Sequence, residues 1–122
     1  MSGKSTVKTV VAEENFNEVI TANDLVLLDF WASWCGPCRQ FEPVYEGAAE
    51  RNPDLVFGKI DTEAQPELAA DFNIRSIPTL MIMKEQAVVF AQAGALPADA
   101  LADLIAQARN FEVDKADSVD GE

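Results

Sequence analysis

Two cysteines, Cys35 and Cys38, stand three positions apart and are the only cysteines in the chain. The apolar run at residues 25–28 lies shortly before them. A helical spacing of apolar residues follows them, at Phe41, Val44, Tyr45, Ala48 and Ala49. The pair is therefore predicted at the junction between a buried strand and a helix. Residues three apart on a helix lie about 5–6 Å from each other, which suits the Cα separation that a disulfide needs.

This position at a helix start is expected to activate one of the two sulfurs. The unpaired backbone N–H groups and the positive dipole end of a helix favour a thiolate, so we expect them to lower the pKa of the Cys35 thiol. Arg39 adds positive charge nearby, although solvent screens that charge if the side chain is exposed. Cys35 is thus the predicted nucleophile of a dithiol–disulfide couple, and its sulfur must be within reach of a visiting molecule.

Two other roles for the cysteine pair are a structural crosslink and half of a metal site. A ring this short would stabilise the fold by roughly 2 kcal/mol, because it constrains the unfolded chain weakly. Zinc usually takes four protein ligands. The chain has 2 cysteines and no histidine, so a thiolate site would need a second chain. Redox chemistry is therefore the favoured interpretation.

The residues around the pair resemble the active site of the thioredoxin family. The resemblance rests on the Trp-Cys-Gly-Pro-Cys motif at residues 34–38, the preceding residues 29–32, Lys59, residues 77–79 and Gly94. It extends from about Phe16 to Phe111. It implies a protein-disulfide reductase that carries electrons by dithiol–disulfide exchange at Cys35 and Cys38, in cell redox homeostasis.

The resemblance also implies an α/β fold, the thioredoxin fold. A mixed five-stranded sheet would have its strands, numbered along the chain, in the order first, third, second, fourth, fifth, flanked by four helices. The residue patterns place strands at 7–11, 25–31, 55–61, 79–83 and 87–93, and helices near 16–20, at 37–51 and 67–72, and from about Pro97. The helix at 37–51 is expected to continue through Pro43 with a kink. Residues 1–111 are predicted to form one domain with a loose start at 1–6, and the acidic residues 112–122 a disordered tail.

Three local features carry sharper expectations. Asn15 is predicted to cap the first helix, and Asn73 to end the short helix in a left-handed conformation. The turn at Lys84, Glu85 and Gln86 lacks the glycine that a tight primed turn favours. A looser or slightly strained turn is therefore expected, and a two-residue type I′ turn centred on Glu85 and Gln86 would contradict this.

Asp29 is an acidic residue in an otherwise apolar strand. A buried carboxylate is costly unless it is paired, and desolvation should raise the pKa of Asp29. Lys59, in the next strand, is the natural neighbour to satisfy it. The resemblance implies that the acid takes the proton from Cys38, with Lys59 tuning it. A satisfied buried acid with no catalytic role is the alternative.

Other residues are expected to tune the couple and to receive a partner. The resemblance implies that Gly36 and Pro37 favour the reduced form. It also implies a cis bond before Pro78, whereas trans is the default because only about 5–6% of such bonds are cis. Gly94 is expected to let a partner's backbone approach closely, and a bulge at a strand end is the alternative. The predicted docking surface consists of Trp34, Ile77, Pro78, Ala93, Gly94 and Ala95.

Composition limits the classes of partner. The net charge of −12 argues against nucleic acid and anionic membranes. The N-terminal residues are polar and lack the apolar core of a signal peptide. No stretch of the sequence approaches the length of a membrane span. We therefore expect a cytoplasmic protein, and we expect it to be a monomer. No bound cofactor or metal is expected. The partners would be disulfide-containing target proteins and a thioredoxin reductase, a flavoprotein that uses NADPH. A thioredoxin-like chaperone or binding subunit, and a disulfide isomerase or oxidant, remain as alternatives.

Overall fold

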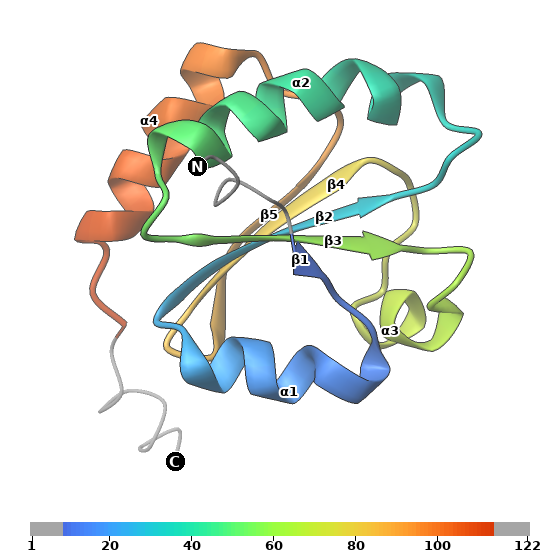
Figure 1. The fold of residues 1–122 in the computed structure, drawn as a ribbon, viewed down its shortest axis with the longest axis horizontal. Helices are drawn as coiled ribbons and strands as arrows, with labels where there is room; N and C mark the ends of the chain where they lie inside the picture. Colours follow the sequence, from blue (N-terminus) through green and yellow to red (C-terminus); the bar gives the residue numbers. More distant parts are fainter. Residues whose placement is uncertain (1–8, 114–122) are drawn as a thin grey trace, which may run out of the picture.

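The structure is a computed structural model that describes residues 9–113. Its elements in chain order are β1 (Thr9–Val10), α1 (Glu13–Ala22), β2 (Leu25–Trp31), α2 (Gly36–Arg51), β3 (Val56–Asp61), α3 (Pro66–Asp71), β4 (Thr79–Lys84), β5 (Ala87–Ala93) and α4 (Ala98–Asn110). The elements form three layers, with α2 and α4 on one face of the sheet and α1 and α3 on the other (Figure 1).

The strands form one five-stranded sheet in the order β1-β3-β2-β4-β5, which confirms the expected topology. β1, β3 and β2 are parallel to one another, and β4 is antiparallel to both β2 and β5. β2 lies in the middle of the sheet, and its first six residues are all buried. Because helices cover both faces of this strand, its sequence is an apolar run rather than an alternation.

Alternation along β2 divides the hydrophobic core between the two faces. Leu25 and Leu27 pack in the cluster beneath α2 and α4. Val26 and Leu28 pack in the cluster on the α1 and α3 side. Successive side chains of a strand point to opposite faces, so Asp29 lies on the face that α2 and α4 cover.

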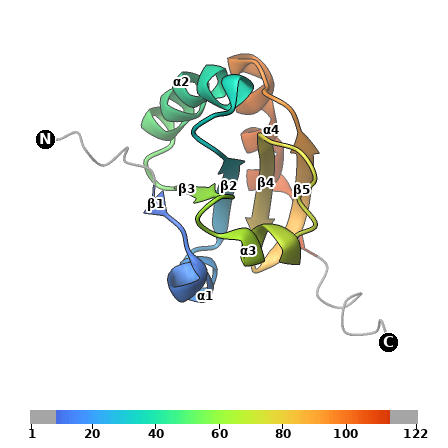
Figure 2. The ribbon, with the colours of Figure 1, turned by 90° about the vertical axis from the view of Figure 1, so that its right-hand side faces the viewer.

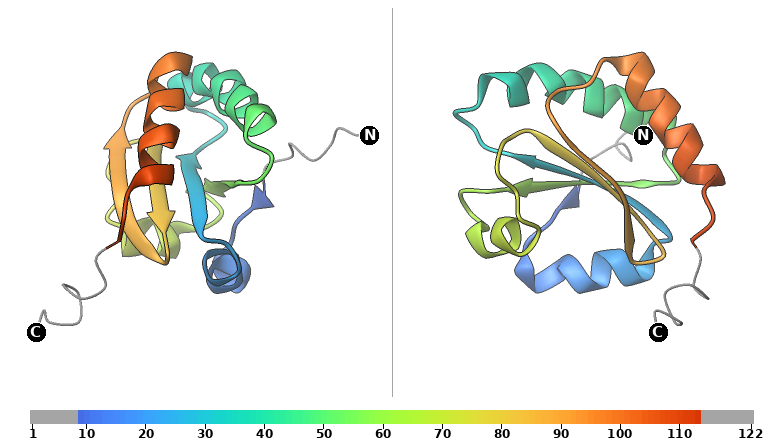
Figure 3. Two further views of the ribbon diagram at one scale, coloured as in Figure 1. Left: turned by 90° about the vertical axis from the view of Figure 1, so that its left-hand side faces the viewer. Right: turned by 180° about the vertical axis from the view of Figure 1, so that it is seen from behind.

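The helix α2 continues through Pro43, as predicted. Its buried residues are Cys38, Phe41, Tyr45, Ala48 and Ala49. The end-on views place α2 over the β3 and β2 half of the sheet and α4 over β4 and β5 (Figures 2 and 3). Two helices therefore share one face, and α2 begins where β2 ends.

The first strand and the first helix differ from the predictions. β1 covers only Thr9–Val10, and residues 7 and 8 of the predicted strand lie outside the described residues. Asn15 is not the N-cap, which is Ala12. The Asn15 side chain instead accepts a hydrogen bond from the Ala12 N–H at 2.7 Å and donates one to the Val10 carbonyl at 2.9 Å. An asparagine three residues into a helix thus ties the preceding loop to the first turn.

The turn between β4 and β5 contradicts the expectation of a looser connection. Lys84 pairs with Ala87, and the two residues between them, Glu85 and Gln86, have φ values of 51° and 69°. Two positive φ angles in a two-residue loop are the geometry of a type I′ turn, which matches the twist of the two strands. The Glu85 N–H also donates to the Asp24 carbonyl at 2.8 Å, so a tertiary contact supports the turn.

The predictions for Asn73 and for the bounds of six helices and strands are confirmed. Asn73 has a φ of 58° and follows α3 in the left-handed region. The bounds of β2 and β5 agree with the predictions, and those of α2, β3, α3 and β4 agree within one residue. Residues 1–6 lie outside the described residues. Of the predicted tail, only Glu112 and Val113 are described, and neither belongs to a helix or strand.

Candidate active site

The two cysteines form a disulfide at the N-terminus of α2. Their Cα atoms are 5.2 Å apart, the separation that the three-residue spacing predicts. Cys35 is the N-cap residue of this 16-residue helix, and its sulfur accepts a hydrogen bond from the Cys38 N–H at 3.1 Å. The first turn of the helix thus points a backbone donor at the predicted nucleophile.

Local sequence explains why the helix begins at this point. A turn after β2 is closed by the Cys35 N–H, which donates to the Ala32 carbonyl at 3.2 Å. Pro37 occupies the first turn of α2, where a residue without an N–H loses no helical hydrogen bond. The Arg39 guanidinium donates to the Ser33 carbonyl at 2.7 Å and so ties the same turn to the helix.

The sulfurs are less open than the sequence led us to expect. Cys35 is 3% exposed and Cys38 is 4% exposed, because the disulfide packs with Ala32, Trp31 and Ile77. Trp34, which precedes the pair, is 65% exposed. Gly36 also faces solvent, and a Cβ built there meets no atom within 4 Å. A partner therefore has to come close along this surface, as a narrow extended segment can.

The loop before β4 lies against the disulfide. The Ile77–Pro78 peptide bond is cis, and the Ile77 carbonyl oxygen lies 3.8 Å from the Cys35 sulfur. Pro78 is buried and its carbonyl accepts a hydrogen bond from the Gly94 N–H at 2.7 Å. These contacts join the loops before α2, β4 and α4 at one end of the sheet, the end that faces the viewer in Figure 2.

Most of the predicted docking residues are accessible at this end. Trp34, Ala93, Gly94 and Ala95 are exposed, Ile77 is half-buried and Pro78 is buried. Gly94 has a φ of +105°, and a Cβ there would meet no atom of the described chain within 4 Å. Within this chain, the positive φ angle, and not a lack of space for a side chain, explains why glycine occupies this position.

Asp29 lies beneath the cysteine-bearing helix and is 1% exposed. The charge of the Asp29 carboxylate acts on the pKa of Tyr45, a residue of α2. Burial raises the pKa of Tyr45 well above its ordinary value, and the Asp29 carboxylate raises it further. The Tyr45 hydroxyl donates to the Gly58 carbonyl at 2.8 Å, which fixes the ring between α2 and β3. That Asp29 handles a proton stays a prediction.

Lys59 lies next to Asp29 in the parallel register of β2 and β3. Its ammonium nitrogen is 3.5 Å from a carboxylate oxygen of Glu42 and 4.4 Å from the centre of the Trp31 ring. The lysine therefore brings positive charge to the strand that carries Asp29, while α2 supplies an acidic partner that the sequence did not suggest. Tuning of Asp29 by Lys59 stays a prediction.

Glu63 also belongs to the site, and sequence reasoning missed it. Its carboxylate accepts a hydrogen bond from the Trp34 indole N–H at 3.1 Å and so orients the exposed ring. The Thr62 hydroxyl donates to the Trp31 carbonyl at 3.2 Å and holds the same loop to the end of β2. A cluster of polar residues directly after β3 was the available signal, because that strand ends beside β2.

Comparisons with known proteins agree with this geometry. A family model described as Thioredoxin matches residues 7–107. The chain belongs to the thioredoxin family. It is 66% identical over 105 residues to a thioredoxin 2 of Streptomyces coelicolor, an alignment that covers 86% of this chain and 78% of that protein. It is 52% identical over 85 residues to Thioredoxin C-3 of Corynebacterium nephridii, which covers 69% of this chain and 59% of that protein.

Solved structures support the same thioredoxin fold. A mutant thioredoxin from Halobacterium salinarum matches with a TM-score of 0.80 at 34% identity, covering 93% of this chain and 100% of that one. Thioredoxin f from spinach chloroplast matches with a TM-score of 0.78 at 36% identity, covering 86% of this chain and 88% of that one. Family membership and the bonded pair make this chain a thioredoxin-like protein-disulfide reductase. Disulfide-containing targets and a reductase are its general classes of partner.

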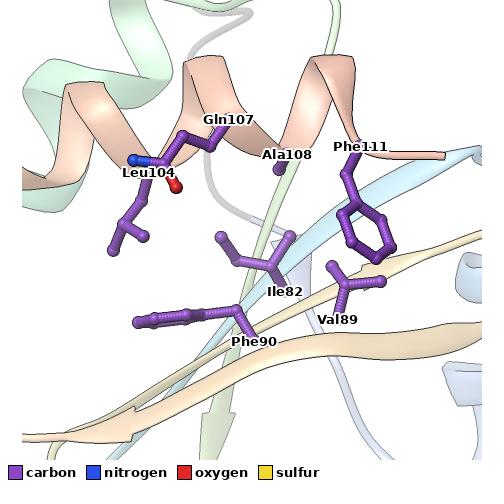
Figure 4. Close-up of a pocket in the computed structure, with 7 residues that line it drawn as sticks. All are labelled: Ile82, Val89, Phe90, Leu104, Gln107, Ala108 and Phe111. Atoms are coloured by element: carbon purple, nitrogen blue, oxygen red, sulfur yellow. The ribbon is translucent and has the colours of Figure 1, made fainter.

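Away from the disulfide, the described residues form a small hollow but no group of metal ligands. Among residues 9–113, no three His, Cys, Asp or Glu side chains are grouped as ligands for a metal ion. No helix in that range is both long enough and apolar enough to cross a membrane. A hollow of about 80 Å³ lies between α4 and the strands β4 and β5, lined by Ile82, Val89, Phe90, Leu104, Gln107, Ala108 and Phe111 (Figure 4). None of these residues belongs to the loops around the disulfide.

Proposed function

We propose that Cys35 and Cys38 carry the reductase reaction as nucleophile and resolving thiol. The Cys35 thiolate attacks one sulfur of a target disulfide, and the other target sulfur leaves as a thiolate. A mixed disulfide then joins Cys35 to the target. Cys38, deprotonated, attacks the Cys35 sulfur and releases the second target thiolate. Two electrons have passed to the target, and the enzyme ends in the bonded form that the structure contains.

The helix start supports the assignment of Cys35 as the nucleophile. Its sulfur accepts a hydrogen bond from the Cys38 N–H, and such a donor stabilises a thiolate more than a neutral thiol. The Cys38 sulfur belongs to the first turn of the helix and is buried against the core. Cys35 is buried to the same degree, so the two roles are assigned by position. Cys38 lies in the first turn after the N-cap Cys35 and within bonding distance of its sulfur, as a resolving thiol must.

Asp29 is proposed to accept the proton of Cys38 in the second step. Its burial and its position on the α2 face support this role, because a carboxyl in an apolar setting holds a proton more readily than one in water. Lys59 is proposed to tune that carboxyl from the neighbouring strand. Gly36 and Pro37 are proposed to shape the pair so that the reduced form is favoured.

Targets are proposed to dock on Trp34, Ile77, Pro78, Ala93, Gly94 and Ala95. The exposed indole offers an apolar platform, and the backbone of the loop before Pro78 can pair with an extended segment. We further propose that the protein works as a cytoplasmic monomer and binds no cofactor. A flavoprotein reductase that draws electrons from NADPH would return the pair to the dithiol. The net charge of −12 makes nucleic acids and anionic membranes poor partners.

The observation that carries the proposal is the sulfur at a helix N-terminus beside the Ile77 carbonyl. Its test is equilibration of the Cys35/Cys38 couple with glutathione buffers, followed by mass spectrometry of alkylated protein. We expect a potential well below that of the isomerases, because a reductase must deliver electrons rather than withdraw them. A potential in the isomerase range would replace the reductase with the isomerase or oxidant alternative. Full function of a Cys35→Ser, Cys38→Ser double variant in cells would favour the chaperone alternative.

A further inference from the structure

Two hollows flank the loop that approaches the disulfide. One, of about 410 Å³, lies on the side of Trp34 and Ala69. The other, of about 270 Å³, lies on the side of Met81 and Gln92. Ile74, Arg75 and Ser76 line both of them. Arg75 is the only charged residue among the lining residues of either hollow.

The charge of Arg75 is not neutralised by its neighbours. Within residues 9–113 it makes no ion pair and no side-chain hydrogen bond, and the side chain is exposed. By contrast, Arg39 donates to a backbone carbonyl, Lys59 is near Glu42, and Arg109 is paired with Asp54. In a chain of net charge −12, this arginine leaves a local positive site at the edge of the docking surface.

The distance from Arg75 to the reacting sulfur fits a docked peptide. Ile77, whose carbonyl lies 3.8 Å from the Cys35 sulfur, is two residues from Arg75. Two residues span at most about 7 Å, and residues 76–78 form a bend, so a long arginine side chain can reach a segment that docks on Ile77. A target segment advances about 3.3 Å per residue. A target side chain about two to four residues from the attacked cysteine would therefore lie beside Arg75.

We propose that Arg75 is a specificity-determining residue that favours target segments with an aspartate or glutamate at that distance from the disulfide. This proposal rests on the proposed reductase function and names a class of its substrates. The other lining residues of the hollows are uncharged, whereas the guanidinium adds a preference by pairing with a carboxylate. Because the pair is exposed, its contribution is modest and depends on salt.

The test uses short synthetic peptides that form a mixed disulfide with a fluorescent thiol. Paired peptides carry Glu or Gln at the second, third or fourth position on either side of the cysteine. The second-order rate constant for reduction by the dithiol protein is measured at low and high ionic strength. For the best position, we expect the wild-type protein to prefer Glu over Gln by about two- to fivefold at low salt, less at high salt. Arg75→Gln should abolish the preference, and Arg75→Glu should reverse it.

Arg51→Gln is the matched control, because Arg51 is also exposed and unpaired within the described residues but ends α2 far from its N-terminus. It removes the same charge and should keep the wild-type preference. The readout is the Glu-to-Gln ratio within each variant, so a change in the overall rate of an Arg75 variant does not affect the test. A circular dichroism spectrum like that of the wild type shows that both Arg75 variants are folded. Equal Glu-to-Gln ratios in wild type and Arg75→Gln would overturn the proposal, as would an Arg51→Gln effect of the same size. A wild-type protein that reduces neither peptide would count against the reductase function instead.

Discussion

The two ends of the sheet are held together by different chemistry. At the end away from the cysteines, charged side chains close the loops. The Arg109 guanidinium binds both carboxylate oxygens of Asp54, at 2.8 and 3.0 Å. The Lys84 ammonium donates to the carbonyls of Ala108, Arg109 and Phe111, the open carbonyls at the C-terminus of α4. At the end that carries the cysteines, the redox end, a backbone hydrogen bond from the Gly94 N–H to the Pro78 carbonyl joins the loops before α4 and β4. The charged groups of Arg39 and Glu63 each hold one nearby group there.

The difference separates stability from reactivity. Charges that pair across loops hold those loops in place, and a cation at a helix C-terminus also interacts favourably with its dipole. Ion pairs of this kind beside the cysteines would shift the thiol pKa values and would occupy a surface that must bind partners. The redox end instead exposes Trp34, Gly36 and Gly94. Variants at the redox end should therefore change rates, and variants at the far end should change stability.

The largest expected effect is at the nucleophile. Cys35→Ser should abolish reduction of insulin disulfides, because a serine hydroxyl cannot form the mixed disulfide. The loss of the short crosslink should lower the free energy of unfolding of the oxidised protein by only about 2 kcal/mol. Turbidity of precipitating insulin chains measures the activity, with Cys38→Ser as the variant that should trap the mixed disulfide. Retained turnover by Cys35→Ser would refute the assignment.

Next in size is Asp29→Asn, which removes the proposed proton acceptor with little change in volume. Resolution of a trapped mixed disulfide should slow by about a hundredfold at neutral pH, within the range of general base catalysis. Stopped-flow fluorescence as a function of pH measures this step. The control is Asp103→Asn, an exposed change of the same charge on α4. If the pH profile of Asp29→Asn matches that of the wild type, Asp29 has only a structural role.

At the far end, Lys84→Met should destabilise the protein and leave its chemistry intact. Hydrogen bonds from a charged donor contribute about 1.5–3 kcal/mol, and the three carbonyls at the end of α4 lose their common donor. We expect the free energy of unfolding in urea to fall by about that amount while insulin reduction is unchanged. A loss of activity in the folded variant would show that the two ends are coupled.

A smaller gain in stability is expected from the turn between β4 and β5. Glu85 and Gln86 have positive φ angles. Residues that carry a Cβ adopt such angles only at a cost in conformational free energy. Replacement by Asn-Gly, the preferred pair for a type I′ turn, should raise the free energy of unfolding by about 1 kcal/mol. Urea denaturation of the double variant tests this. A lower stability would mean that Glu85 contributes more through its own contacts than it loses in backbone strain.

The smallest effect is the pH dependence of the Asp54–Arg109 pair. The hydrogen bond from Arg109 lowers the pKa of Asp54 below 3.8. A depressed pKa contributes stability above the unfolded value of 3.8, and this contribution disappears as the pH falls through the lower folded value. Asp54→Asn should therefore be less stable than wild type at pH 6, and the two should converge in acid. The Arg109 side chain is 38% exposed and that of Asp54 is 61% exposed, so salt should shrink the difference at pH 6.

The redox end could be predicted from local sequence to a large extent. The apolar run of β2, the helical period after Cys38 and the three-residue spacing of the cysteines placed the pair correctly at a helix start. Family resemblance added the sheet order and the cis bond before Pro78, which no local pattern contains. The burial of Cys35 was not predicted, because it depends on Ile77, which lies 42 residues further along the chain.

The far end was predicted less well, for a physical reason that also applies to Lys59 and Glu63. Helix and strand preferences act over a few neighbouring residues, so the sequence alone determined which segments are helices and strands, where the cysteines stand and which acid is buried. The partner of a long polar side chain depends on which segments meet in space. Only the tertiary structure therefore decided that Lys84 caps α4, that Lys59 approaches Glu42 and Trp31, that Glu63 holds Trp34, and that Glu85 and Gln86 accept a tight turn supported by Asp24.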